Sequence, residues 1–230
     1  MSILCAMLLL LGRPTDHSVT LNVVSPVDAT VRVEYDARQS PAQTLKADVP
    51  AEFELTGLKP DTRYAYRVGV QEGTFQTQRA PGRTFTFGVQ GDSHPERNGK
   101  MFNAGLYAQT LCNVVQDAPD FYVMLGDDFS IERLVERQTL SQSAVDSVYA
   151  RQRDFLGALG RSTALFLVNG NHEQAARYSL DGTATNCAVF AGRSRTRFFP
   201  LPSPDGFYSG DAESVGHIGL LRDYYAWTWG

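Results

Sequence analysis

Hydrophobic and polar positions alternate in short runs along the first third of the chain. Aromatic and β-branched residues fall at every second position in the segments 19–24 (VTLNVV), 29–35 (ATVRVEY) and 63–70 (RYAYRVGV). Turn-forming pairs such as Ser25-Pro26 and Ser40-Pro41 separate these runs. Short strands at this spacing, without helical periodicity, predict a small antiparallel β-sandwich over residues 14–82.

The pattern changes after the turn-forming segment RAPGR. Continuous apolar runs that predict buried strands occur at 84–90 (TFTFGVQ), 121–125 (FYVML) and 164–168 (ALFLV). Between them, apolar residues recur at helical spacing within 102–118 and again within 145–159. The order strand, helix, strand, helix, strand predicts an α/β layered domain with right-handed crossovers over residues 83–230. No strong period follows Glu173.

Charge adds little to this picture. The 230 residues carry a formal net charge of −4, and 43% of them are hydrophobic, which is an ordinary globular composition. The densest basic stretch is GRSRTR (192–197), which we interpret as a solvated loop. The sequence therefore shows no nucleic-acid footprint.

The apolar N-terminal stretch from Ile3 to Leu11 has two interpretations. It is too short to span a bilayer, so we expect no transmembrane segment. It is either the apolar part of a signal peptide, which would imply a secreted or periplasmic protein, or a first strand or frayed start of the chain. The compartment stays open on this evidence.

Each of the three predicted α/β strands ends in a glycine followed by side chains that can bind a metal. The endings read GDSH (91–94), GDD (126–128) and GNHE (170–173). Because the carboxyl ends of such strands meet at one edge of the sheet, we expect the three endings to form one pocket. On an extended segment, residues two apart face the same side, so Asp92 and His94 could bind one ion together. Asp128 is interpreted as a helix cap.

The chemistry of these side chains favours a divalent metal site. Carboxylate, imidazole and amide ligands without a thiolate suit Mn, Fe or Zn better than they suit a structural zinc cage. A carboxylate such as that of Asp127 has two oxygens and could bridge two ions about 3.5–4 Å apart.

The three endings, in this order, resemble the motif set G-D-x-H, G-D-x-x, G-N-H-[DE] of the calcineurin-like metallophosphoesterases. This resemblance covers residues 83–173. The segment 58–68 (LKPDTRYAYRV) is similar to a stretch of fibronectin type III-like domains in which a tyrosine hydroxyl, here that of Tyr64, pins the preceding corner. The combined arrangement is similar to that of purple acid phosphatases and the related alkaline phosphodiesterases. It implies part of an α/β layered metallophosphoesterase sandwich, preceded by a small all-β fibronectin III-like sandwich.

The resemblance implies a phosphoester hydrolase that uses two divalent metal ions and a metal-bound hydroxide to act on a small-molecule substrate. Asp92 and His94 would bind the first ion. Asp127 would bridge both ions, and Asn171 would bind the second one. The identity of the ions remains open among Mn, Fe and Zn.

Two further residues have implied roles outside the metal ligands. His172 would be the catalytic residue that contacts the phosphoryl oxygen, and Glu173 would hold an imidazole in its orientation. The family also supplies three later histidines, two of them in a G-H-x-H pattern, whereas His217 is the only later histidine here and lies outside such a pattern. We therefore expect only the N-terminal part of the catalytic domain, without its C-terminal metal ligands. The alternative is a truncated or degenerate, non-catalytic product whose β-sandwich acts as a binding module. Whether the substrate is a monoester, a diester or a nucleotide stays open.

Overall fold

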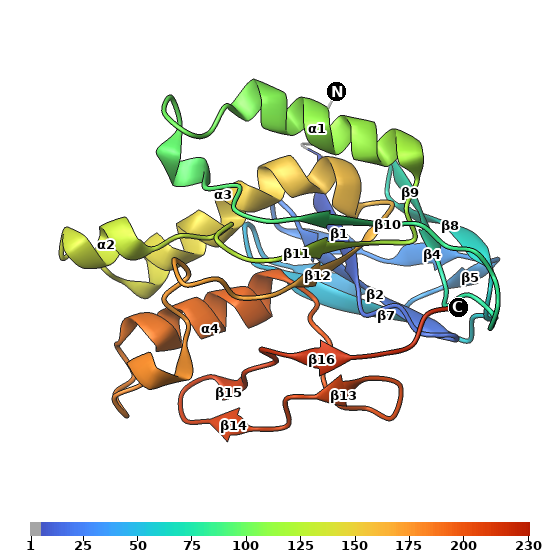
Figure 1. The fold of residues 1–230 in the computed structure, drawn as a ribbon. Helices are drawn as coiled ribbons and strands as arrows, with labels where there is room; N and C mark the ends of the chain where they lie inside the picture. The colour runs from blue at the N-terminus through green and yellow to red at the C-terminus, as the bar shows by residue number, and fades with distance from the viewer. Residues whose placement is uncertain (1–5) are drawn as a thin grey trace.

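The computed structural model describes residues 6–230, and its first part consists of antiparallel strands (Figure 1). A three-stranded sheet has the order β1-β2-β7, and a four-stranded sheet has the order β5-β4-β8-β9. The strands of this N-terminal β region are β1 (Leu8–Gly12), β2 (Ser18–Val24), β3 (Ala29–Val31), β4 (Val33–Tyr35), β5 (Arg38–Gln39), β6 (Gln43–Leu45), β7 (Ala51–Thr56), β8 (Arg63–Val68) and β9 (Gln71–Gln76). The antiparallel pairing predicted here is confirmed.

Strand β1 connects the N-terminal β region to the rest of the chain. It pairs with β2 along its whole length and also contacts β12 (Ala164–Leu167) and α3 (Gln142–Gly160). Side chains alternate between the two faces of a strand, so Leu9 and Leu11 join one hydrophobic cluster while Leu10 joins the other. The strand interpretation of the N-terminal apolar stretch is thus confirmed for Leu8–Gly12, whereas residues 3–5 lie outside the described residues.

A buried arginine strengthens the same connection. Arg153, fully buried on α3, donates hydrogen bonds to Asn22 Oδ1 at 2.7 Å, to the Leu8 carbonyl at 3.1 Å and to the Phe198 carbonyl. The guanidinium group has five donors, so it can satisfy oxygens of three separate segments at once. Burial lowers the pKa of Arg153 to about 9.

The corner contact expected of Tyr64 is confirmed. Its hydroxyl accepts a hydrogen bond from the Lys59 backbone N–H at 2.8 Å, and its ring stacks on Phe75 with the centroids 5.5 Å apart. Strand β8 alternates between exposed and buried positions, so Tyr64, Tyr66 and Val68 all enter the core.

The second part of the chain follows the predicted order of strands and helices. Its first three strands are parallel and lie in the order β10-β11-β12. The elements are β10 (Phe87–Gln90), η1 (Pro95–Arg97), α1 (Ala104–Asp117), β11 (Phe121–Met124), α2 (Glu132–Glu136), α3 (Gln142–Gly160) and β12 (Ala164–Leu167). Asn103 and Ser141 cap α1 and α3 by accepting backbone N–H groups, as polar residues at N-caps do.

The two faces of this parallel sheet pack against different partners. Phe121 and Phe166 point into the cluster that contains the N-terminal β region, and Trp227 stacks on Phe166 with the centroids 4.2 Å apart. Tyr122 and Met124 point to the other side, into the cluster formed with the helices. Figure 1 shows α3 lying between α1 and α4, and α3 contacts both helices.

Two α-helices were not predicted, namely the short α2 and a longer helix that follows Glu173. Residues after Glu173 form η2 (Arg177–Ser179), α4 (Cys187–Phe198) and four two-residue strands, namely β13 (Ser209–Gly210), β14 (Ser214–Val215), β15 (Gly219–Leu220) and β16 (Tyr225–Ala226). The interpretation of GRSRTR as a solvated loop is wrong, because the segment lies in α4. Arg195 is 2% exposed and donates to the carbonyls of Leu167, Leu221 and Arg222 at 2.7–3.2 Å.

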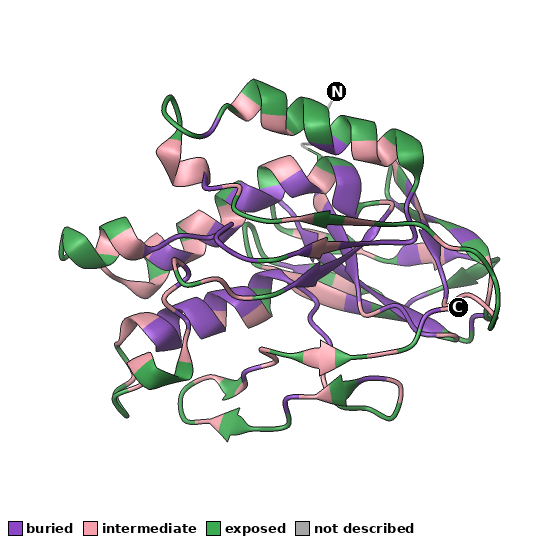
Figure 2. Ribbon diagram, viewed as in Figure 1, coloured by how far each residue is buried: buried purple, intermediate pink, exposed green. Residues whose placement is uncertain are grey.

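Strand β10 is an edge strand with an exposed face, visible in Figure 2. Phe87 and Val89 are each 51% exposed, and Leu125 beyond β11 is 52% exposed. Within residues 6–230, no helix combines the length and apolar character needed to cross a bilayer.

Candidate metal centre

The three glycine-containing strand endings lie together, as the parallel order of β10, β11 and β12 predicts. Backbone hydrogen bonds join the endings directly. The Asp92 N–H donates to the Gly126 carbonyl at 3.0 Å, and the His94 N–H donates to the Asp127 carbonyl at 3.1 Å. The His172 N–H donates to Asp127 Oδ1 at 2.9 Å. Asp127 therefore contacts both of the other endings.

Four of the predicted site residues contribute side chains to one cluster. One ligand atom each from His94, Asp127 and His172 lies within 4.8 Å of the others. His94 Nε2 is 3.7 Å from Asp127 Oδ2 and 3.8 Å from Asp92 Oδ1. His94 and Asp127 are 7% and 8% exposed, whereas the side chain of Asp92 is 75% exposed. The cluster is thus buried on one side and open at Asp92.

The loop that carries Asp92 and His94 is not extended, which corrects the geometric argument made for their spacing. Asp92, His94 and Asp127 all adopt positive φ angles, of 57°, 45° and 58°. Non-glycine residues rarely adopt this left-handed conformation, and such strain gathers at functional sites. Asp92 and His94 approach each other because the chain turns at both residues, not because it continues as a strand.

Glycines allow two of the endings to approach closely. A Cβ atom at Gly126 would overlap the Gly170 backbone nitrogen and lie 2.6 Å from the Gly170 Cα. A Cβ atom at Gly170 would overlap Asp127 Oδ1 and lie 2.6 Å from the Asp127 nitrogen. Gly91 is different, because an added Cβ there would make only an ordinary contact with Leu125 at 3.5 Å.

A carboxylate pairs with the Nδ1 atom of each imidazole. His94 Nδ1 is 2.9 Å from Glu96 Oε1, and His172 Nδ1 is 2.8 Å from Glu132 Oε2. The Nε2 atom of each ring is therefore left to face the cluster. A carboxylate partner at the other nitrogen generally fixes the tautomer and the ring orientation of an imidazole that binds a metal. Neither Glu96 nor Glu132 was predicted. Glu96 lies only two residues after His94, but nothing in the sequence relates Glu132 to His172.

Glu173 has a different role from the one predicted. Its two oxygens accept the backbone N–H groups of Asp127, Asp128, Phe129 and Gly170 at 2.7–3.0 Å rather than an imidazole N–H. Glu173 is 1% exposed, so these charge-assisted bonds join the second and third endings inside the protein.

Asp128 and Asn171 take contrasting positions. Asp128 is 1% exposed and does not cap a helix, because its Oδ1 accepts from Gln90 Nε2 at 3.0 Å and from the Ser93 N–H at 3.4 Å. Burial raises the pKa of the Asp128 carboxyl to about 6. Asn171 is exposed, and its carbonyl accepts from Gln174. His217 is also exposed, in the turn between β14 and β15.

The donor set fits a divalent metal ion. Two imidazoles and a buried carboxylate converge, with a second carboxylate at the open side, and mixed nitrogen and oxygen ligands of this kind suit Mn, Fe or Zn. The positions of the orienting carboxylates support the same conclusion.

PhoD and a purple acid phosphatase are among the solved structures that resemble this chain. PhoD aligns with a TM-score of 0.56 and 17% sequence identity over 86% of this chain and 47% of PhoD. The purple acid phosphatase PPD1 from yellow lupin (Lupinus luteus) seeds aligns with a TM-score of 0.58 and 16% identity, over 86% of this chain and 41% of PPD1. This chain spans less than half the length of either protein. No protein-family model and no curated protein matches its sequence. With parallel strands whose metal-capable endings meet at one edge, the chain has a metallophosphoesterase-like fold.

Proposed function

We propose that this chain is a metal-dependent hydrolase of small-molecule phosphoesters with a dinuclear metal centre. The observation that carries the proposal is the cluster of His94, Asp127 and His172, in which a carboxylate fixes each imidazole. The likeness to a purple acid phosphatase supports the same reaction class.

Each proposed ligand has a defined part in this site. Asp92 and His94 would hold one ion, and Asp127, whose Oδ2 faces His94 and whose Oδ1 accepts the His172 N–H, would contribute to both ions. Asn171 would hold the second ion. Glu173 keeps the second and third endings in register through their backbone amides. Two divalent ions at such a site would supply charge stabilisation for the phosphoester and a more acidic water.

His172 acts on the substrate in this proposal. Because Nδ1 pairs with Glu132, the Nε2 atom is free to donate a proton toward a phosphoryl or leaving oxygen.

Hydrolysis of p-nitrophenyl phosphate and of its bis ester tests the proposal. We expect slow hydrolysis that depends on added Mn²⁺ or Zn²⁺, because Asp127 and Asn171 are the only direct ligands proposed for the second ion. The variant Asp127→Asn should lose this activity. As a matched control, Asp117→Asn changes an exposed aspartate at the end of α1 and should retain the activity. Turnover that continues without metal, or in Asp127→Asn, would overturn the proposal.

A metal count separates the two possible roles of His172. If His172 contacts the substrate, His172→Ala should keep its bound metal and lose turnover. If His172 is itself a metal ligand, as its place in the cluster permits, the variant should lose metal as well.

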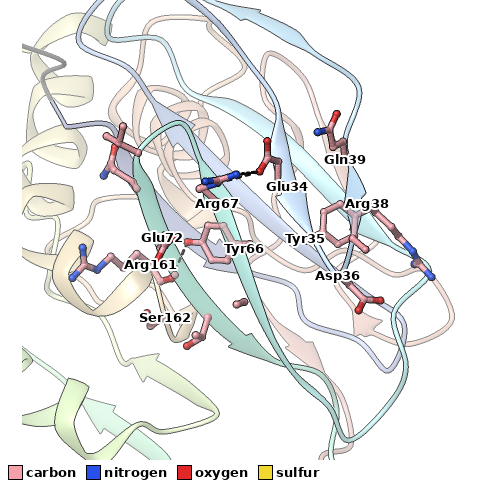
Figure 3. Close-up of a pocket in the computed structure, with 16 residues that line it drawn as sticks. Glu34, Tyr35, Asp36, Arg38, Gln39, Tyr66, Arg67, Glu72, Arg161 and Ser162 are labelled. Carbon is pink, nitrogen blue, oxygen red and sulfur yellow. Dashed lines mark hydrogen bonds and ion pairs between the residues drawn. The ribbon is translucent and has the colours of Figure 1, made fainter. Parts of the chain in front are cut away.

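The alternative of a non-catalytic binding module would rest on a hollow in the N-terminal β region, shown in Figure 3. This open hollow of about 910 Å³ lies between strands β4, β5, β8 and β9 and the turn at Arg161. Some of its polar groups pair with the protein itself, since Arg67 bonds Glu34 and the Tyr66 hydroxyl bonds the Arg161 carbonyl. The hollow contains no group of converging side chains comparable to His94, Asp127 and His172 among the described residues, which favours the hydrolase.

A further inference from the structure

Three buried oxygens close to the candidate metal centre lack a hydrogen-bond partner in the described part of the chain. They are Glu96 Oε2, Asp128 Oδ2 and Gln152 Oε1. The three residues line one small cavity of about 40 Å³, together with Ser130. Asp128 and Gln152 are each 1% exposed, so water from the surface does not reach these oxygens freely. Unpartnered buried polar atoms are rare in native proteins, and three around one cavity must have a physical cause.

The other polar atoms of these three groups are already bonded, which fixes their orientation. Glu96 Oε1 pairs with His94 Nδ1. Asp128 Oδ1 accepts from Gln90 Nε2. The Gln152 amide nitrogen donates to Ser93 Oγ at 3.1 Å and to the Tyr107 hydroxyl at 3.3 Å, so its oxygen is directed away from them. The three oxygens therefore cannot turn away from the cavity without breaking existing bonds.

The chemistry of the cavity selects its occupant. Two carboxylates and an amide oxygen are all acceptors, and Ser130 offers a hydroxyl that can accept as well. Two carboxylates held together need a positive charge, because burial penalises each negative charge. Arg151 also lines the cavity, but it is exposed and leaves all three oxygens unpaired. One water-sized occupant needs roughly 10–15 Å³ of such a volume. The cavity of about 40 Å³ therefore has room for an ion with few attached waters.

We propose that Glu96, Asp128 and Gln152 bind one hard divalent cation, Ca²⁺ or Mg²⁺, at a site distinct from the candidate metal centre. Hard cations of this kind prefer carboxylate and amide oxygens, whereas the candidate metal centre supplies imidazole nitrogens. The bound cation links helix α3 to the loop after β10 through Gln152 and Glu96. The inference is independent of the proposed phosphoesterase activity, because it concerns cation binding alone.

Titration calorimetry with CaCl₂, and separately with MgCl₂, tests the site on chelator-treated protein. We expect one cation per chain to bind through this site, and the same cation to raise the thermal unfolding temperature. Both effects should be lost in Asp128→Asn, where an amide N–H replaces the unpartnered oxygen and satisfies the cavity without a cation. They should also be lost in Gln152→Met, which keeps the side-chain volume and removes the oxygen.

Two control variants establish where the cation binds. Gln142→Met removes an unpartnered amide oxygen from the same helix but outside the cavity, and it should keep the binding. Asp92→Asn changes the candidate metal centre at its exposed position, and it should keep the binding too. Loss of binding in Asp92→Asn with retention in Asp128→Asn and Gln152→Met would place the cation in the candidate metal centre and overturn the inference. Absence of binding by either cation to the unaltered chain would overturn it as well, and would leave water as the occupant.

Discussion

The Nδ1 atom of His172 lies 2.8 Å from Oε2 of Glu132, a residue 40 positions earlier in the chain. Glu132 begins the short helix α2, and His172 lies in the loop after β12. The backbone holds the same two segments together, because the Ile131 N–H donates to the His172 carbonyl at 3.1 Å. The orientation of the imidazole therefore depends on a helix that follows a different strand.

Replacing Glu132 by glutamine should weaken the proposed hydrolysis. The neutral amide is a weaker partner than the carboxylate for His172 Nδ1, so the ring is held less firmly, and outer partners of this kind are worth about 10–100-fold in activity or metal affinity. Steady-state kinetics at a single pH would show the loss as a lower kcat/KM. Glu136→Gln, an exposed change on the same helix, should leave the rate unaltered. Equal effects of the two substitutions would contradict a role for Glu132.

Gly170→Ala should abolish metal binding by the candidate metal centre. The added Cβ overlaps Asp127 Oδ1, so the second and third endings must move apart. Metal content after dialysis against Zn²⁺ or Mn²⁺ measures the effect. Gly216→Ala places a methyl group in open space and should bind as much metal as the unaltered chain. Full metal occupancy in Gly170→Ala would show that the endings need not approach so closely.

Glu173→Gln should destabilise the fold by about 1–3 kcal/mol. Four backbone N–H groups point at the two carboxylate oxygens, and a glutamine would direct its own NH₂ group at two of them. Urea unfolding of the metal-free proteins measures the difference in the free energy of unfolding between Glu173→Gln and the unaltered chain. The exposed Glu54→Gln on β7 serves as the comparison and should change stability little. A stability of Glu173→Gln equal to that of Glu54→Gln would mean that water satisfies these amides.

Asp181 should make stability depend on acid pH. Hydrogen bonds from Asn186 and Thr183 lower the pKa of its carboxyl to about 2, and Asn186 in turn caps α4. A group whose pKa is lowered on folding stabilises the protein above its unfolded value of 3.8, and this contribution disappears as pH falls through the folded value. The stability difference between the unaltered chain and Asp181→Ala should therefore be constant above about pH 4 and shrink between pH 4 and 2. Chemical unfolding at several pH values measures it. A difference that does not change with pH would exclude the carboxylate as its source.

Local patterns predicted much of the fold. The alternation in β8 predicted which residues are buried, and the apolar runs at 121–125 and 164–168 became β11 and β12. The contact of Tyr64 with Lys59 spans five residues, so the sequence motif contains both partners. In contrast, α4 was missed because most of its apolar residues lie together in Cys187–Ala191 instead of recurring at helical spacing, and because Arg195 reads as a surface residue until its three carbonyl partners are known.

The candidate metal centre was also predicted only in part. The order of the endings GDSH, GDD and GNHE after three strands was enough to predict that the three endings would lie together, because parallel strands present their carboxyl ends at one edge. It did not predict that His94, Asp127 and His172 would cluster while Asn171 stays exposed. The sequence by itself determined which side chains could form a site and at which edge of the sheet. Only the tertiary structure decided how they are held. The carboxylate behind His172, the amides around Glu173 and the burial of Asp128 arise between segments far apart in the chain, where no local periodicity relates one partner to the other.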